Sequence, residues 1–381
     1  MPDAEAGRTG LLLAAFLAAL AACAPAEAGY DLLIRGGLVL DGTGAPGRSA
    51  DVGVRDGRIA LVGDAGDAEA GDEVDATGMV VAPGFIDAHS HAWPGLADSA
   101  LSDARALLAQ GITTVVLNPD GTGPPDLARQ RDGIEVHGAG VNFAQLVPHD
   151  SIRREVMGFE DREPTPREME RMRGLVRRGM EEGALGLSTG LWSAPGHYAS
   201  TEEVVELARI AGEHGGVYHS HIRDEGDVTV GVHAAVDELI RISEEAGLPA
   251  VITHIKVYGV GMHGRAGEVV ERVERARNRG LEIWADQYPY DRAGGSVRLL
   301  LFPLWAQEGG EEALARRIRD PSMRPRLRRA AVALLERWGG AGRLRVVRFE
   351  ADPSLEGRTL EEIASGRGVD PVDLAMEIQL A

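Results

Sequence analysis

From Phe85 onward, short apolar segments alternate with amphipathic helical segments, and this alternation constrains the fold more than any other feature of the 381-residue chain. Strands that alternate with helices form parallel βα units, and a long run of such units is typical of a (β/α)8 barrel. We predict an α/β fold of this TIM-barrel type, with about seven of its strands present. The predicted strands are Phe85–His89, Thr113–Leu117, Val141–Val147, Ala184–Leu187, Val217–Ile222, Ala250–Ile255 and Leu281–Ala285.

Two of the intervening helices have clear start signals. Thr165–Glu168 and Ser200–Glu203 each place a hydroxyl residue three positions before a glutamate, which predicts a capping box in both helices. In the first helix, Pro166 also suits the first helical position.

The remaining segments indicate how the chain is divided. Residues 29–82 contain short strand-like runs and an Asp56-Gly57 hairpin signal, which predict the N-terminal part of a small β-sandwich-like domain. The barrel is expected over residues 83–290. Residues 291–381 are predicted to be a helical insertion before the eighth strand, with one strand over Leu344–Phe349, and we expect the chain to end before the barrel closes.

The first 28 residues are predicted to be a secretory leader. The apolar run Leu11–Leu20 is too short to span a membrane but suits a signal peptide. It is followed by Leu20-Ala21-Ala22-Cys23, which resembles a bacterial lipobox; cleavage after Ala28 and a disordered Ala-rich tail are the alternatives. We therefore expect export to the periplasm or cell envelope, with membrane contact only through a lipid anchor at Cys23.

Charge and cysteine content exclude two classes of protein. The chain has 40 Lys and Arg against 59 Asp and Glu, a net charge of −19, whereas a nucleic-acid partner requires a basic face. The single cysteine excludes a disulfide framework and a cysteine-rich zinc site.

Four histidines lie at the ends of predicted barrel strands, where functional side chains of such barrels gather. His89 and His91 end the first strand, and their spacing of two residues places both rings on one face. His221 ends the fifth strand and His254 the sixth. Because neutral imidazole is a good ligand for metals such as zinc, we predict a metal site from these four residues. We place His219 on the opposite face from His221 and leave it out.

Two charged residues accompany these histidines. Asp120 follows the second strand in a Pro-Asp-Gly sequence, which is either a simple turn or a source of a carboxylate ligand that bridges two cations. Lys256, the only lysine of the chain, lies two residues beyond His254. It is either an ammonium group that pairs with a substrate carboxylate, which we favour, or a carbamylated lysine that bridges metals.

The segment 83–91, Pro-Gly-Phe-Ile-Asp-Ala-His-Ser-His, resembles the opening signature of the amidohydrolase superfamily. Narrower matches indicate the N-acyl-D-amino-acid deacylases, also called D-aminoacylases. These matches are Glu182–Leu191, His221–Gly226, His254–Lys256 and Asp286–Tyr290.

The resemblance implies roles for individual residues. It implies zinc, as one or two ions, with His89, His91, His221 and His254 as ligands. It also implies that Lys256, Tyr288 and Ser296 contact a substrate carboxylate, and Arg223 of the same motifs is a further candidate for substrate binding. The implied reaction is metal-assisted hydrolysis of the amide bond of N-acyl-D-amino acids, with a small molecule as the partner.

The chain departs from the family pattern at two points. Members of the family place a cysteine ligand where this chain has Asp120, and oxygen is a harder ligand than thiolate. The family's general-base aspartate comes from the eighth strand, which we expect beyond Ala381. Two other functions stay open: a cyclic amidase of the hydantoinase or dihydroorotase type, although the fourth strand lacks the lysine it would need, and an inactive, metal-binding exported lipoprotein.

Overall fold

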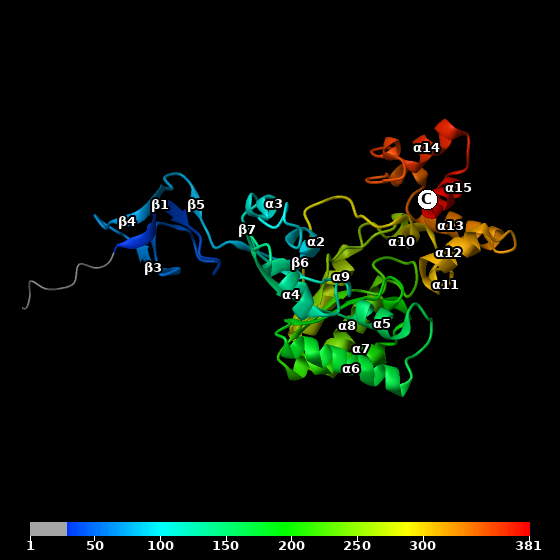
Figure 1. The fold of residues 1–381 in the computed structure, drawn as a ribbon, viewed down its shortest axis with the longest axis horizontal. Coiled ribbons are helices and arrows are strands. Elements are labelled where there is room, and N and C mark those ends of the chain that lie inside the picture. The colour runs from blue at the N-terminus through cyan, green and yellow to red at the C-terminus, as the bar shows by residue number, and fades with distance from the viewer. Residues whose placement is uncertain (1–28) are drawn as a thin grey trace, which may run out of the picture. The chain divides into compact units, whose positions relative to one another are not determined.

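The structure is a computed structural model that describes residues 29–381, which divide into two compact units between Gly84 and Phe85 (Figure 1). The predicted leader and Cys23 lie outside the described residues. Among the residues that are described, no helix is both long and apolar enough to pass through a bilayer.

The N-terminal unit is a five-stranded sheet in the order β3-β2-β1-β4, with β5 also paired to β1. The strands are β1 (Tyr30–Val39), β2 (Arg48–Arg55), β3 (Arg58–Gly63), β4 (Ala70–Asp75) and β5 (Val80–Val81). The predicted hairpin joins β2 to β3, where Asp56 and Gly57 have φ angles of 53° and 69°. Such a pair of positive angles suits the tight turn of a hairpin. The described residues of this unit form one sheet, so the sandwich-like expectation is corrected to a single layer.

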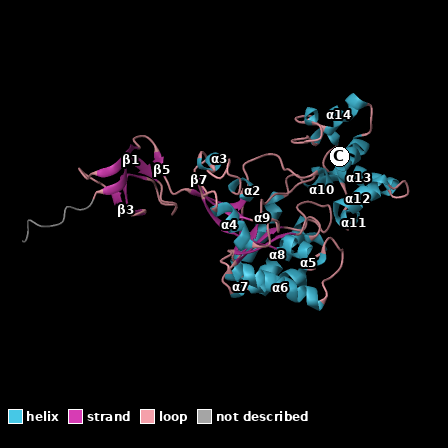
Figure 2. Cartoon of the chain, in the orientation of Figure 1, coloured by secondary structure: helices cyan, strands magenta, loops and turns pink. Residues whose placement is uncertain are grey.

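The parallel strands of the second unit pair in sequence order, in one sheet of three strands and one of five. Figure 2 shows the strands and helices of this unit. The strands are β6 (Phe85–Ser90), β7 (Ile112–Leu117), β8 (Asn142–Gln145), β9 (Val147–Pro148), β10 (Gly186–Gly190), β11 (Val217–His221), β12 (Ala250–Ile252) and β13 (Ile283–Ala285). Strands β8 and β9 correspond to one predicted strand, interrupted at Leu146, whose N–H donates to the carbonyl of Leu117 at 3.0 Å. The seven predicted strands are therefore all present.

Helices connect these strands. They are α2 (Trp93–Leu96), α3 (Arg105–Leu108), α4 (Leu127–Glu135), α5 (His149–Met157), α6 (Pro166–Glu181), α7 (Thr201–Glu213), α8 (Val232–Ala246) and α9 (Ala266–Asn278), with 3-10 turns η1 (Gly196–Tyr198) and η2 (Val260–Met262). The capping box of α6 is confirmed, with Thr165 and Glu168 bonded reciprocally. At α7, Ser200 caps the helix, but the side chain of Glu203 turns instead to His149.

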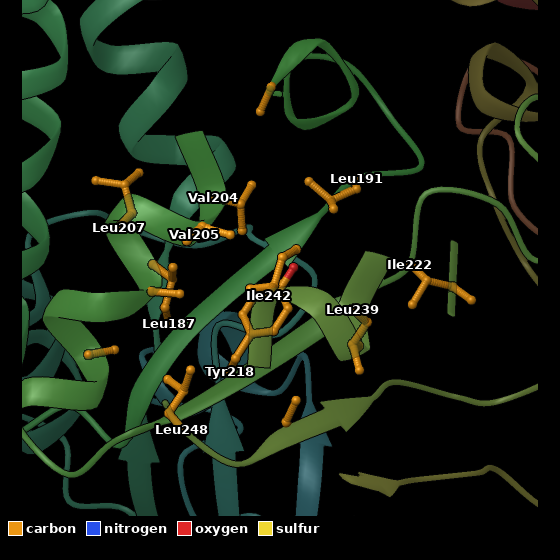
Figure 3. Close-up of a cluster of buried hydrophobic side chains, with 14 of the residues drawn as sticks. Leu187, Leu191, Val204, Val205, Leu207, Tyr218, Ile222, Leu239, Ile242 and Leu248 are labelled. Atoms are coloured by element: carbon orange, nitrogen blue, oxygen red, sulfur yellow. The ribbon is translucent and has the colours of Figure 1, made fainter. Parts of the chain in front are cut away.

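The main core lies between the sheet and helices α6 to α8. Leu187 of β10 and Tyr218 of β11 are fully buried, together with Leu207 of α7 and Ile242 of α8. Figure 3 shows these side chains packed against one another around the strands. Each fully buried aliphatic or aromatic side chain contributes about 1.5–3 kcal/mol. This packing fixes the strands, and so it fixes the strand ends where the site lies.

A second core holds the C-terminal helices together. These are α10 (Val297–Leu301), α11 (Leu304–Gln307), α12 (Gly310–Arg319), α13 (Arg324–Arg337), α14 (Leu360–Arg367) and α15 (Pro371–Leu380), with η3 (Ala341–Arg343) and η4 (Pro353–Leu355). The strand predicted over Leu344–Phe349 is wrong. That segment makes one isolated bridge, from Arg345 to Thr359. It pairs with the short turn before α14 and not with another strand, so no ladder of hydrogen bonds extends the bridge.

Candidate metal centre

The four predicted histidine ligands meet around the carboxylate of the fifth predicted ligand, Asp120. Its Oδ2 lies 3.2 Å from Nε2 of His89 and 3.3 Å from Nε2 of His91. Its Oδ1 lies 3.6 Å from Nε2 of His254 and 3.9 Å from Nδ1 of His221. These side chains come from the carboxyl ends of β6, β7, β11 and β12, which is the end of a parallel barrel where functional groups converge.

The spacing of these atoms fits a zinc ion. With bonds of about 2.0–2.1 Å, the ligand atoms of tetrahedral zinc lie about 3.3 Å apart. Asp120, His221 and His254 offer ligand atoms that are all within 4.8 Å of one another, and so do Asp120, His89 and His91. Imidazole nitrogen and carboxylate oxygen are both common ligands of zinc in proteins.

The loop that carries Asp120 is strained and tightly held. Asn118 and Asp120 have φ angles of 63° and 53°, in the left-handed region that costs a non-glycine residue about 1–3 kcal/mol. The buried amide of Asn118 exchanges two hydrogen bonds of 2.8 Å with Gln130, and Ser188 donates to the carbonyl of Asn118 at 2.6 Å. These bonds offset the strain and aim Asp120 at the histidines.

His254 is also held in the left-handed region, with a φ of 36°. Its backbone N–H donates to Oδ1 of Asp286 at 2.5 Å. The preceding residue, Thr253, donates its hydroxyl to Oδ1 of Asp120 at 3.2 Å. The end of β12 is thus tied both to Asp120 and to the end of β13.

Glu225 is a buried carboxylate that sequence reasoning did not select. Its Oε1 lies 2.8 Å from Nδ1 of His254 and 2.7 Å from Nζ of Lys256, and its Oε2 lies 3.6 Å from Nε2 of His221. It therefore contacts both histidines on the ring nitrogen that faces away from Asp120. Only its position four residues after the predicted ligand His221 could have indicated from the sequence that Glu225 lies near the site.

His219 and Asp286 were also missed as members of this cluster. The expectation that His219 faces away from His221 is wrong, because residues two apart on a strand share a face. His219 is buried, its ring centroid lies 5.5 Å from that of His89, and its Nε2 lies 3.3 Å from Oδ2 of Asp286. Asp286 also lies 3.5 Å from Nδ1 of His89.

The predicted substrate contacts divide into two pairs. The ring of Tyr288 lies 6.3 Å from that of His254, and the ammonium of Lys256 lies 5.6 Å from the centre of the Tyr288 ring, so both residues border the metal centre. Arg223 and Ser296 stay predictions. The guanidinium of Arg223 binds Glu238 at 2.7 Å and the carbonyls of residues 197 and 199, so most of its donors are used within the protein. Ser296 is the exposed N-cap of α10.

The charges of the centre stabilise one another. Burial alone would lower the pKa of His89, but the neighbouring carboxylates of Asp120 and Asp286 raise it to about 10. Burial would raise the pKa of Asp120, but His254, His89 and His91 hold it well below its usual value. His221 is different, because burial dominates and lowers its pKa. A neutral, buried imidazole of this kind is ready to act as a metal ligand.

The chain is similar in sequence to known proteins. A model of the amidohydrolase family matches residues 72–380, and a model of the urease alpha-subunit N-terminal domain matches residues 18–85. D-aminoacylase from Alcaligenes xylosoxydans xylosoxydans is 35% identical over 378 residues, which cover 92% of this chain and 69% of that protein. N-acyl-D-glutamate deacylase from the same organism is 36% identical over 299 residues, which cover 71% of this chain and 58% of that protein.

The chain is also similar in structure to solved deacylases. A crystal structure of D-aminoacylase has a TM-score of 0.74 at 33% identity, with 92% of this chain and 70% of that chain covered. N-acyl-D-glutamate deacylase from Bordetella bronchiseptica, solved with zinc and a phosphonate inhibitor, has a TM-score of 0.77 at 32% identity and the same coverage. The predicted barrel and resemblance are confirmed: the chain belongs to the amidohydrolase family, in the group that includes D-aminoacylase.

Proposed function

We propose that this protein hydrolyses the amide bond of N-acyl-D-amino acids with the help of bound zinc, and releases a carboxylate and a D-amino acid. The observation that carries the proposal is the convergence of four histidines on Asp120 at the barrel mouth. The names of the relatives, D-aminoacylase and N-acyl-D-glutamate deacylase, support the class of substrate. The cyclic-amidase alternative has less support, since β10 ends in Ser188-Thr189-Gly190 without a lysine.

Asp120, His221 and His254 would hold a zinc ion, and His89 and His91 would complete the centre on the other side of Asp120. Zinc in such a site lowers the pKa of a water molecule and polarises a carbonyl group. The protein supplies the geometry. Hydrogen bonds hold the left-handed backbone near Asp120 and at His254, and they fix the direction of both side chains before any substrate arrives.

Lys256 and Tyr288 would hold the α-carboxylate of the substrate. The ammonium of Lys256 is paired with Glu225 at 2.7 Å, so its position is fixed and its charge is balanced. A substrate carboxylate would share this ammonium, and the fixed anchor would decide which stereoisomer presents its acyl carbonyl to the metal. A charged anchor rejects substrates that lack the carboxylate far better than an apolar pocket rejects a missing methylene.

The experiment is an assay of the 381-residue protein beside the full-length gene product with N-acetyl-D- and N-acetyl-L-amino acids, before and after zinc is removed with a chelator. In the product that carries the general-base aspartate, we expect hydrolysis of the D-isomers, its loss with the chelator and its return with zinc. Equal hydrolysis of both isomers, or hydrolysis that the chelator leaves unchanged, would contradict the proposal. A hydantoin substrate in the same assay tests the cyclic-amidase alternative.

We also propose that the protein is exported and anchored through Cys23. The apolar run Leu11–Leu20 and the lipobox-like sequence that ends at Cys23 support this proposal. Growth with labelled fatty acid should label the wild-type protein and not the Cys23→Ala variant. Wild-type protein recovered unlabelled from the cytosol would contradict it.

A further inference from the structure

We infer that Asp286 is a positioning residue that orients two of the metal ligands, His89 and His254, although it lies outside the predicted ligand set. The inference rests on the proposed metal-dependent function. Asp286 follows β13 directly, and its carboxylate lies between the ends of β6, β11 and β12.

The first contact is with the ring of His89. Oδ1 of Asp286 lies 3.5 Å from Nδ1 of His89, while Nε2 of the same ring lies 3.2 Å from Asp120. A histidine that binds a metal through one ring nitrogen usually donates the other N–H to a carboxylate or carbonyl, which fixes its tautomer and orientation. Nδ1 of His89 is buried and has no hydrogen-bond partner among the described residues. Asp286 is therefore the acceptor placed to orient this ring.

The second contact is with the backbone of His254. The N–H of His254 donates to Oδ1 of Asp286 at 2.5 Å. His254 has a φ of 36°, a backbone conformation that is unfavourable for most residues other than glycine. Backbone hydrogen bonds hold Asp286 itself in place, because its N–H donates to Ile252 and its carbonyl accepts from Ile255. The same carboxylate oxygen thus faces the ring of one ligand and supports the backbone of another.

His219 holds the other oxygen. Its buried Nε2 lies 3.3 Å from Oδ2 of Asp286, so the second carboxylate oxygen also faces a histidine ring. The groups that contact Asp286 therefore come from three strand ends, β6, β11 and β12. A loss of the carboxylate should loosen His89 and His254 together, and metal affinity should fall without the loss of a ligand.

The test is zinc affinity, measured by competition with a chromogenic chelator, for wild type and Asp286→Asn. We expect the variant to bind zinc about tenfold to hundredfold more weakly. Glu203→Gln is the matched control: Glu203 is also a buried carboxylate that pairs with a histidine, His149, but it contacts none of the predicted ligands. Its zinc affinity should equal that of wild type.

Wild-type zinc affinity in folded Asp286→Asn would overturn the inference. It would also be overturned if wild type bound two zinc ions and the variant lost one of them with the other unchanged, because Asp286 would then be a ligand. If the wild-type protein bound no zinc, the proposed zinc-dependent function itself would be contradicted. If Asp286→Asn does not fold, His219→Gln takes its place: zinc affinity should fall by about threefold to tenfold, and unchanged affinity would overturn the inference.

Discussion

Nε2 of His89 and Oδ2 of Asp120 lie 3.2 Å apart, although 31 residues separate them in the chain. The contact joins the ends of β6 and β7, and the same carboxylate reaches His254 through its other oxygen, at 3.6 Å. Asp120 is therefore the residue on which the predicted ligands from separate strands converge. Its oxygen chemistry should decide which metal the centre prefers.

Asp120→Cys should shift metal preference toward softer ions. Thiolate selects zinc over hard ions such as manganese, whereas carboxylate accepts both. We expect the ratio of zinc to manganese affinity to rise by about tenfold or more in the variant, as measured by competition between the two metals. Asp132→Cys, on the exposed side of α4, is the control and should leave the ratio unchanged. An unchanged ratio in Asp120→Cys would show that this side chain does not bind the metal.

Lys256→Ala should mainly lose discrimination for free carboxylates. A hydrogen bond to a charged group contributes about 1.5–3 kcal/mol, which corresponds to roughly tenfold to hundredfold in kcat/KM. The measurement is the ratio of kcat/KM for an N-acetyl-D-amino acid to that for its methyl ester. The ratio should fall in the variant. A ratio equal to that of wild type would show that Lys256 does not recognise the carboxylate.

Gly121→Ala should destabilise the loop that carries Asp120. Gly121 has a φ of 65°, and a Cβ there would lie 2.2 Å from Oδ1 of Asp150. We expect a loss of about 1–3 kcal/mol in the free energy of unfolding, measured with urea. Gly133→Ala in α4 is the control, because a Cβ there meets no atom within 4 Å and alanine favours a helix. Equal stability of the two variants would contradict the packing described at Gly121.

Stability should fall as the pH rises from about 6.5 to about 9, because of a buried ionic cluster. Burial alone would lower the pKa of His149, but Asp150 and Glu203 raise it to about 9. Glu203 is bound in turn by Arg153. Because the folded state holds this proton more tightly than the unfolded state, the stabilisation is complete below the unfolded pKa. It is lost as the pH rises through the folded pKa, and amounts to on the order of 3 kcal/mol.

Urea unfolding of wild type and His149→Gln at several values between pH 6 and pH 9.5 measures this contribution. The difference in unfolding free energy between the two proteins should shrink with rising pH. A difference that stays constant over this range would mean that His149 does not carry the proton.

The sequence was sufficient to predict the order of the barrel strands and the positions of the candidate ligands. Apolar runs bounded by turns mark buried parallel strands, and strand ends mark the barrel mouth. The His89 and His91 pair follows from the period of two along a strand. The same period, applied correctly, would also have included His219.

Other features depend on contacts between distant segments. Arg223 binds Glu238, and no local pattern in the sequence predicts this ion pair. Glu225 and Asp286 acquire their roles from histidines on other strands. Leu344–Phe349 has the composition of a strand, but it meets only the short turn before α14. In each case, a tertiary partner overrides the local signal.

The most direct test of the metal centre is the zinc content and zinc affinity of His221→Ala compared with wild type and with His137→Ala. His221 is a predicted ligand whose side chain is only 16% exposed, whereas His137 lies on the surface. The account predicts bound zinc in wild type and in His137→Ala, and a loss of at least a hundredfold in affinity in His221→Ala, since removal of one ligand leaves the ion undercoordinated. Zinc bound by folded His221→Ala with wild-type affinity would contradict it.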